Sequence, residues 1–189
     1  MTDLHRFLEG LIGLSEAHRE ALQWFHAHRD QEVSWPSPRP NGFFLVNKAK
    51  GIHKPAGSAY ALSVRESLGG PYPDRAPVYE ADGSWTYPYF QEQPDPEKRD
   101  SMFTNRALLA CQRDRIPLGV IRQVKAKPNP RYKVLGLAIV GNWEDGYFNL
   151  RGLIPDGTNL SYIGELAKAE GAGSEDKEFN PASTTVVNF

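Results

Sequence analysis

Histidine and cysteine are the first side chains to consider for metal or nucleophilic chemistry, and here they form no usable pattern. The chain has five histidines and a single cysteine, Cys111. His26 and His28 are two residues apart on a predicted helix, so their side chains point to different faces and do not share a metal ion. One cysteine excludes a zinc site built on paired thiolates, and the sequence has no phosphate-binding glycine loop or G-x-S-x-G pattern. We therefore predict no metal ion and no cofactor.

One acidic pattern is compatible with a metal-dependent nuclease. Pro155-Asp156 is followed by Glu175-Asp176-Lys177, which fits the loose PD…(D/E)-x-K arrangement. In such enzymes the carboxylates hold Mg²⁺ from adjacent strands, and the ion polarises a phosphate. Here the second half lies in an acidic tail that lacks strand character. Asp156, Glu175 and Lys177 are therefore kept as an alternative catalytic set.

Positive charge is concentrated in one part of an otherwise neutral chain. The 22 Lys and Arg residues nearly balance the 23 Asp and Glu residues, which leaves a net charge of −1. Residues 104–134 nevertheless hold eight basic side chains against one acidic side chain. Because exposed charges attract within a Debye length of roughly 8–10 Å, a local basic face can bind phosphates in a neutral protein. The alternative is that these charges are ordinary solvated faces of strands and a helix.

The elements that must position these side chains change character near residue 40. Residues 3–29 carry an apolar stripe with a helical period, Gly13 marks a break, and Ser15 can cap a second helix. The proline-rich stretch 35–40 cannot continue a helix and is predicted to be a linker. The sequence therefore predicts an N-terminal helical arm that ends near residue 40.

Beyond residue 41 the pattern is that of short strands with one central helix. The predicted helix covers 105–112, and the predicted strands cover 42–46, 60–65, 84–90, 117–125, 132–143 and 147–150. Many strands with few helices favour an α+β domain built on a curled sheet or barrel. A last helix is predicted at 162–169 and a loose tail at 171–189.

Length and composition fit one domain with an appendage. The chain has 189 residues, of which 40% are hydrophobic, as is usual for a globular protein. It has no run of about 18 apolar residues for a membrane span, and its N-terminus lacks the apolar core of a signal peptide. We predict a cytoplasmic protein with no membrane partner, divided into 1–40, 41–170 and 171–189.

Seven short blocks follow one another along the chain. They are G-I-H-K-P at 51–55, A-Y-A-L-S-V at 59–64, G-G-P-Y-P-D at 69–74, G-S-W-T-Y at 83–87, T-N-R-A-L-L-A-C at 104–111, P-L-G-V-I-R-Q-V-K at 117–125 and G-Y-F at 146–148. Together they resemble the SRA (SET- and RING-associated, or YDG) family, whose members flip modified cytosine out of DNA. The most specific block is 104–111, which is close to the family's T-N-R-A-L-x-x-N-C. The chain departs from the family where the Y-D-G triplet is absent after Tyr132, and where an extra segment, 75–81, is inserted. The resemblance implies an SRA/PUA-like curled β-barrel with flanking helices.

The resemblance also implies a pocket for a flipped base. Extruding a base costs a few kcal/mol, and stacking on aromatic planes returns roughly 1–3 kcal/mol per base. By position, Tyr72 and Tyr87 resemble the two planes, and Asp74 resembles the carboxylate that accepts from the cytosine N4 amine. Trp85 and Tyr89 lie beside Tyr87 on the same strand and are further candidates for the pocket wall. The alternative for each aromatic is a core position, and for Asp74 a turn position.

Contacts to DNA outside the pocket follow from the same resemblance. Two loops of the family enter the DNA grooves, and the matching positions here are His53-Lys54 and Lys98-Arg99, although the latter pair could be an ordinary exposed hairpin end. Phosphate contacts position a protein on DNA without reading its sequence. The candidates for these contacts are Arg106, Arg122, Lys125 and Lys127.

We therefore predict a non-catalytic reader of 5-methyl- or 5-hydroxymethylcytosine in double-stranded DNA. It resembles the recognition half of bacterial modification-dependent restriction endonucleases, in which an HNH nuclease usually follows. The chain has no H-N-H cluster, so it would be either a truncated reader or a stand-alone module that acts with a separate nuclease. A metal-dependent nuclease and a modification-independent nucleic-acid-binding barrel are the alternatives. The helical arm serves either as a homodimer contact or as a cover for its own barrel.

Overall fold

The chain folds into helices packed around one sheet. The structure, a computed structural model, describes residues 3–70 and 75–154. The elements are α1 (Asp3–Gly10), α2 (Glu16–Ala27), β1 (Glu32–Val33), β2 (Ile52–His53), β3 (Ser63–Glu66), β4 (Val78–Tyr79), β5 (Trp85–Phe90), the 3₁₀ helix η1 (Pro96–Ser101), α3 (Phe103–Asp114), β6 (Leu118–Lys125), β7 (Arg131–Glu144) and β8 (Tyr147–Gly152). This confirms the predicted α+β class. None of the described helices is both long enough and apolar enough to cross a membrane.

The eight strands found in residues 3–70 and 75–154 belong to one sheet. Its order is β2-β3-β6-β7-β8-β5-β4, and β1 pairs with β7 outside this path. The pairings are antiparallel except that of β3 with β6, which is parallel. In the part of the chain that the structure describes, β2 and β4 each have one neighbour. The described sheet is therefore open, and the predicted closure into a barrel is not observed.

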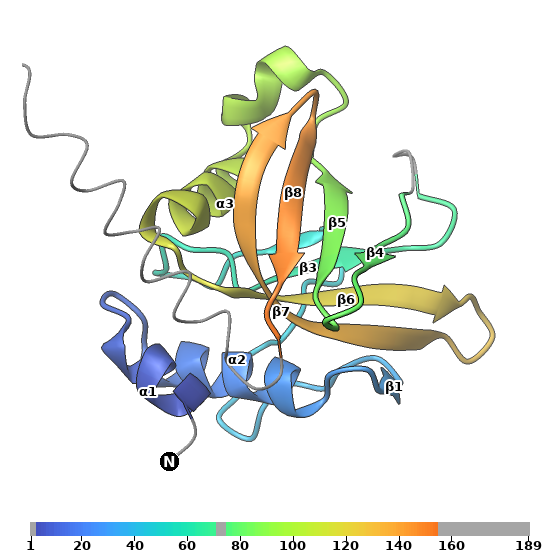
Figure 1. Cartoon of the computed structure of the whole chain (residues 1–189). Helices are drawn as coiled ribbons and strands as arrows, with labels where there is room; N and C mark the ends of the chain where they lie inside the picture. Colours follow the sequence, from blue (N-terminus) through green and yellow to red (C-terminus); the bar gives the residue numbers. More distant parts are fainter. Residues whose placement is uncertain (1–2, 71–74, 155–189) are drawn as a thin grey trace, which may run out of the picture.

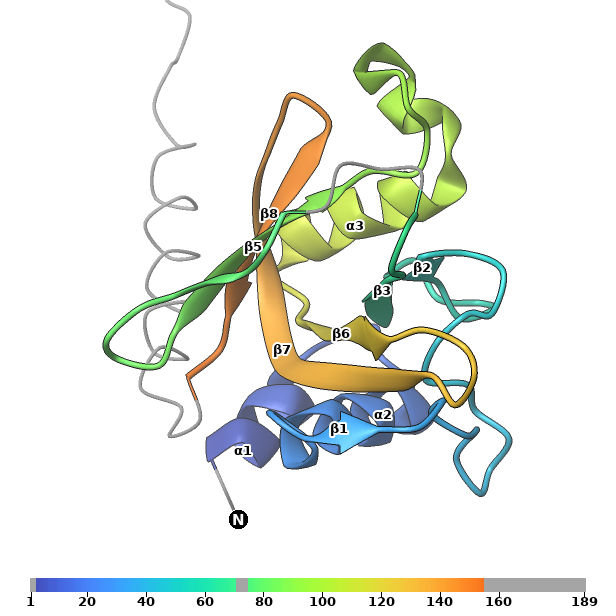
Figure 2. The same ribbon diagram turned by 90° about the vertical axis from the view of Figure 1, so that its right-hand side faces the viewer.

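The sheet is folded over at its longest strand. β7 has 14 residues; its first part pairs with β6 and its second part with β8. Register shifts interrupt both pairings, and such irregularities bend a strand and increase its twist. Figure 2 shows β7 turning sharply between the β6–β7 hairpin and the part of the sheet that contains β8 and β5. The bend places β5 on a different plane from β3 and β6.

The N-terminal helices cover this sheet from one side. Ser15 caps α2 as predicted, since its side chain accepts a hydrogen bond from the His18 amide at 3.2 Å. Leu8, Leu22 and Phe25 are fully buried in the same core as the strands. Figure 1 shows α1 and α2 lying beneath β6 and β7. The apolar stripe of the arm is thus used within the chain, while the predicted boundary near residue 40 and the homodimer contact stay predictions.

The strand predicted at 42–46 is wrong, because other groups take the hydrogen bonds that a strand would need. The segment is a loop. The Leu45 carbonyl accepts from the Ser63 hydroxyl at 2.7 Å, and the Phe44 carbonyl accepts from His53 Nε2 at 3.0 Å. The Leu45 side chain is nevertheless buried. The apolar residues at 42–46 therefore serve the core, although their backbone does not pair with another strand.

The remaining predictions for the chain fall into three groups. Strands β5, β6, β7 and β8 and helix α3 lie where the pattern predicts them, within two residues at each end, while β3 begins three residues after the predicted start at residue 60. Elements β1, β2, β4 and η1 were not predicted, because two-residue strands and a 3₁₀ turn are too short to show a period. The predicted helix at 162–169 and the tail at 171–189 lie outside the described residues.

Candidate functional site

A cavity of about 700 Å³ lies between β3 and β5. Sites of roughly 300–1,000 Å³ hold small organic ligands. Residues from distant parts of the sequence line it: 49–51 before β2, 65–67 on and after β3, Gly70, Arg75, 87–90 on β5, 92–94, and Met102. The bend in β7 allows this, because it lets β5 face β3 across the interior.

Strand β5 forms one wall of the cavity through residues 87–90. Trp85, Tyr87 and Tyr89 all point inward from the strand and are buried. Tyr87 and Tyr89 line the cavity, and their rings meet edge to face with 6.3 Å between the centroids. Trp85 does not line it; this side chain lies against Gly152 and borders a second cavity of about 310 Å³. The structure therefore brings Tyr87 and Tyr89 together and separates Trp85 from them.

A charged pair, Glu66 and Arg122, lies beside the phenol of Tyr87. Glu66 and Arg122 form an ion pair, and they are direct neighbours across the parallel strands β3 and β6. The Arg122 guanidinium lies 5.4 Å from the centre of the Tyr87 ring, and the Glu66 carboxylate interacts with the Tyr87 phenol. Burial, together with the negative charge of Glu66, raises the pKa of Tyr87 far above its usual range, so the phenol remains a hydrogen-bond donor.

Of the four predicted phosphate contacts, Arg122 is half-buried beside Tyr87 and paired with Glu66, whereas Arg106, Lys125 and Lys127 are exposed. All four phosphate contacts stay predictions. Glu66 is a site residue that the sequence analysis missed. Glu66 could be recognised only by its position opposite Arg122. That position depends on the register between β3 and β6, which the sequence does not give.

Gly51 explains why the first of the SRA-like blocks begins with glycine. A Cβ on this residue would collide with the Tyr89 hydroxyl and lie 3.2 Å from the Arg65 carbonyl. The Gly51 carbonyl in turn accepts from the Arg65 amide at 2.7 Å. The bare backbone at this position lets the loop before β2 approach both β3 and the Tyr89 side chain.

The T-N-R-A-L block has a buried structural part. Thr104 and Asn105 are buried at the start of α3, and both hydrogen-bond to Glu92, whose side chain lines the cavity. Lys50, on the opposite segment of the cavity wall, forms an ion pair with Glu92 at 3.2 Å and lies over the Phe103 ring. Glu92 could not be found from the sequence either, because its partners Thr104 and Ile52 are 12 and 40 residues away along the chain.

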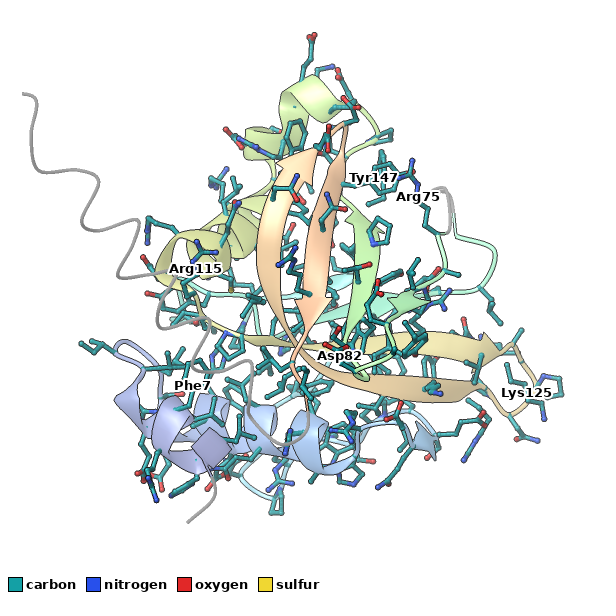
Figure 3. The ribbon with its side chains drawn as sticks, viewed as in Figure 1. Phe7, Arg75, Asp82, Arg115, Lys125 and Tyr147 are labelled. Atoms are coloured by element: carbon teal, nitrogen blue, oxygen red, sulfur yellow. The ribbon has the colours of Figure 1, made fainter. Side chains whose placement is uncertain are left out.

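Positive charge flanks the same side of the molecule. The Arg75 guanidinium lines the cavity and lies 3.9 Å from the centre of the Tyr147 ring. In Figure 3, Arg75 and Tyr147 lie together on the right, and Lys125 stands at the tip of the β6–β7 hairpin on that side too. Arg75 belongs to the extra segment 75–81, so part of this insertion does reach the cavity.

The predicted groove loops are more constrained than simple exposed loops. His53 Nε2 is hydrogen-bonded to the Phe44 carbonyl, and burial lowers the pKa of this histidine. Lys98 is exposed and paired with Asp95 at 3.2 Å. Arg99 pairs with Asp100 and lies 4.6 Å from the centre of the Trp143 ring. Lys54 is half-buried after β2. Their contacts with DNA stay predictions.

Tyr72 and Asp74 lie outside the described residues, and so do Asp156, Glu175 and Lys177. The described neighbours on both sides of 71–74, Gly70 and Arg75, line the cavity. Within residues 3–70 and 75–154, no group of three His, Cys, Asp or Glu side chains could hold a metal ion.

Comparisons with known proteins give matches only among solved structures. No family model matches the sequence, and no curated protein matches it. Six chains of solved structures match. The SUVH5 SRA domain with fully methylated CG DNA is 22% identical, and the match covers 64% of this chain and 86% of that chain, with a TM-score of 0.35. The same SRA domain with methylated CHH DNA is 24% identical over 53% of this chain and 70% of that chain, with a TM-score of 0.31.

A structure of KRYPTONITE in complex with mCHG DNA and SAH is also similar. It is 25% identical, with a TM-score of 0.31, and the match covers 49% of this chain and 22% of that chain. This chain thus spans about a fifth of the KRYPTONITE chain in that structure. The matched structures include SRA domains, which is the family that the sequence blocks resemble.

Proposed function

We propose that this chain is an SRA-type domain that binds double-stranded DNA containing a modified cytosine and holds the flipped base in the cavity between β3 and β5. One observation carries the proposal. Three blocks that resemble the SRA family in sequence, at 51–55, 69–74 and 83–87, contribute Gly51, Gly70 and Tyr87 to the lining of a single cavity. The solved SRA structures named above hold methylated DNA, and we extend that class of ligand to this chain as part of the proposal.

The proposed mechanism balances the cost of flipping against contacts in the cavity. Removing a base from the stack costs a few kcal/mol, and an aromatic contact returns roughly 1–3 kcal/mol. Tyr87 and Tyr89 supply this contact from β5, and Tyr72 is proposed to supply a second plane. Because Glu66 and Arg122 hold Tyr87 in place, its ring does not have to be ordered when the base enters, which lowers the entropic cost of binding.

Recognition of cytosine is assigned to a carboxylate. Among the bases, cytosine presents an exocyclic N4 donor beside its C5 substituent. Asp74 is proposed to accept from this amine. The methyl group alone is worth about 0.8 kcal/mol of burial, so preference for the modified base also depends on the shape of the cavity.

The duplex is proposed to lie across the side of the molecule that carries Arg75 and the tip of the β6–β7 hairpin. Lys125 and Lys127 are exposed there, and Arg106 is exposed on α3. Such side chains bind phosphates without regard to sequence. In this proposal the chain is a reader without catalysis, and a nuclease of the HNH type, supplied separately, would cut the DNA in a modification-dependent restriction system.

A binding titration at fixed salt tests the proposal. Matched duplexes would carry cytosine, 5-methylcytosine, 5-hydroxymethylcytosine or N6-methyladenine at one site. We expect tighter binding to a modified cytosine, and loss of about tenfold or more of that affinity in Tyr87→Ala. Tyr79→Ala is the matched control, since Tyr79 is a half-exposed tyrosine on β4 that does not line the cavity.

Other outcomes would overturn parts of the proposal. Equal affinity for all duplexes, unchanged in Tyr87→Ala, would identify a modification-independent nucleic-acid-binding protein. Preference for N6-methyladenine would keep the cavity but reject cytosine recognition by Asp74. Mg²⁺-dependent cleavage of modified DNA that is lost in Asp156→Ala would instead identify a nuclease.

A further inference from the structure

Two segments of the cavity wall, the loop that leads into β2 and the stretch from Glu92 to Met102, are tied to the same side chain. Building on the proposed function, we propose that Glu92 is a positioning residue. It holds these two segments, and with them the basic residues Lys50 on the first and Lys98 and Arg99 on the second, at the separation that duplex DNA requires. It acts through its neighbours and does not itself read the base.

The carboxylate of Glu92 accepts hydrogen bonds from three donors on two segments of the chain. Its Oε1 accepts from the Ile52 amide at 3.2 Å. Its Oε2 accepts from the Thr104 hydroxyl at 2.6 Å and from Lys50 Nζ at 3.2 Å. The side chain thus connects the loop before β2 to the first turn of α3.

The backbone of Glu92 is hydrogen-bonded to Asn105, the residue that follows Thr104 in α3. The Glu92 amide donates to Asn105 Oδ1 at 3.0 Å, and Asn105 Nδ2 donates to the Glu92 carbonyl at 2.6 Å. Asn105 Nδ2 also donates to the Arg99 carbonyl at 3.0 Å. Since Asn105 is fully buried, the start of α3 holds both ends of the stretch from Glu92 to Arg99.

These contacts favour positioning over direct reading of a base. Glu92 is only 9% exposed, and both of its carboxylate oxygens already accept from protein donors. A buried carboxylate with charge-assisted bonds is rigid, and removing it leaves its donors unpaired at a cost greater than the net value of the bonds. The consequence of such a loss is a displacement of two DNA-facing segments relative to each other.

The experiment compares Glu92→Gln, Thr104→Val and Thr104→Ser with the unaltered chain. Affinity for modified and unmodified duplexes is measured over a series of salt concentrations, at a temperature where each variant is folded by circular dichroism. Gln112→Leu is the matched control, because Gln112 lies near the other end of α3 and donates to the Gly141 carbonyl, away from the cavity.

We expect Glu92→Gln and Thr104→Val to bind both duplexes about tenfold more weakly and with a shallower dependence of log K on log salt. The slope reports the number of phosphates contacted, so loops that no longer reach the backbone reduce it, whereas simple loss of stability in a protein that is still folded does not. Thr104→Ser retains the hydroxyl and is expected to restore affinity to within about twofold. In the double variant the two effects should not add, since both remove the same link.

Each contrary result has a distinct meaning. If the unaltered chain does not distinguish modified from unmodified DNA, the proposed function fails. If it does, and Glu92→Gln and Thr104→Val retain both affinity and salt slope, positioning by Glu92 is wrong while the proposed function stands. If Glu92→Gln removes the preference for the modified base at an unchanged slope, Glu92 reads the base directly and the inference is overturned.

Discussion

The ring of Phe25 in α2 rests directly on the backbone of Gly119 in β6. A Cβ at residue 119 would collide with three atoms of that ring, and Phe25 is fully buried. Gly119 is paired with Ser63 in β3 on one side and with Leu137 in β7 on the other. The N-terminal helices are therefore seated on the central strands of the sheet and not on its edge.

Gly119→Ala is expected to destabilise the protein, because the added methyl group must displace a close-packed ring. Overpacking of this kind costs about 1–3 kcal/mol, measurable as a lower free energy of unfolding in urea. Gly10→Ala is the control, since a Cβ at residue 10 meets nothing within 4 Å. Equal destabilisation by the two substitutions would show that the Phe25 contact is unimportant.

Lys125→Gln combined with Lys127→Gln should weaken binding to modified and unmodified duplexes to a similar degree. Each lost phosphate contact lowers the slope of log K against log salt by about 1, so the double variant should lower it by about 2. Arg113→Gln removes one charge from an exposed position elsewhere on the protein and should leave the slope unchanged. A loss of preference for the modified base would place the hairpin tip at the base itself.

His18 should make the protein less stable in acid. It is 1% exposed, and burial, followed by the charges of His53 and Arg19, lowers the pKa of His18 from 6.5 to about 4. The unfolded chain then binds a proton more readily than the folded chain, so stability is full above pH 6.5 and falls as the pH approaches 4. The loss at pH 4 is about 3 kcal/mol.

The measurement is urea unfolding between pH 7 and pH 4. His18→Phe removes the titrating group and should flatten this part of the stability profile. An unchanged profile in that variant would assign the acid sensitivity to other groups.

Cys111 should be inert to thiol reagents while the protein is folded. It is fully buried in α3, and burial raises the pKa of its thiol to about 12, so almost no thiolate forms near neutral pH. Reaction with a chromogenic disulfide should be slow in buffer and rapid in denaturant, at a rate that follows unfolding. Fast labelling of the folded chain would contradict the burial of this helix face.

The sequence predicts the position of a side chain well where that position depends on one helix or strand alone. Alternation along β5 is enough to place Tyr87 and Tyr89 on one face, and both line the cavity. The same rule also includes Trp85, which the structure excludes, because where a cavity ends depends on what packs opposite each ring, here Gly152. Glu66 and Glu92 could not be predicted, since each acquires its role from partners on other elements: Arg122 through the register of β3 with β6, and Ile52 and Thr104 through the packing of α3. Tyr72 and Asp74 remain predictions from the family resemblance.

The parallel pairing of β3 with β6 has a consequence for the order in which the molecule is assembled. The chain leaves β3 at Glu66 and returns to its side only at Leu118, and the intervening crossover contains β5, η1 and α3. Closing so long a connection costs chain entropy before any contact repays it, and non-local pairings of this kind slow folding. In the described sheet, β3 and β5, two walls of the cavity, are connected only through β6, β7 and β8, so they cannot face each other before those strands have paired. A nascent chain that has not yet emerged as far as β6 has most of the binding residues but no site in which to use them.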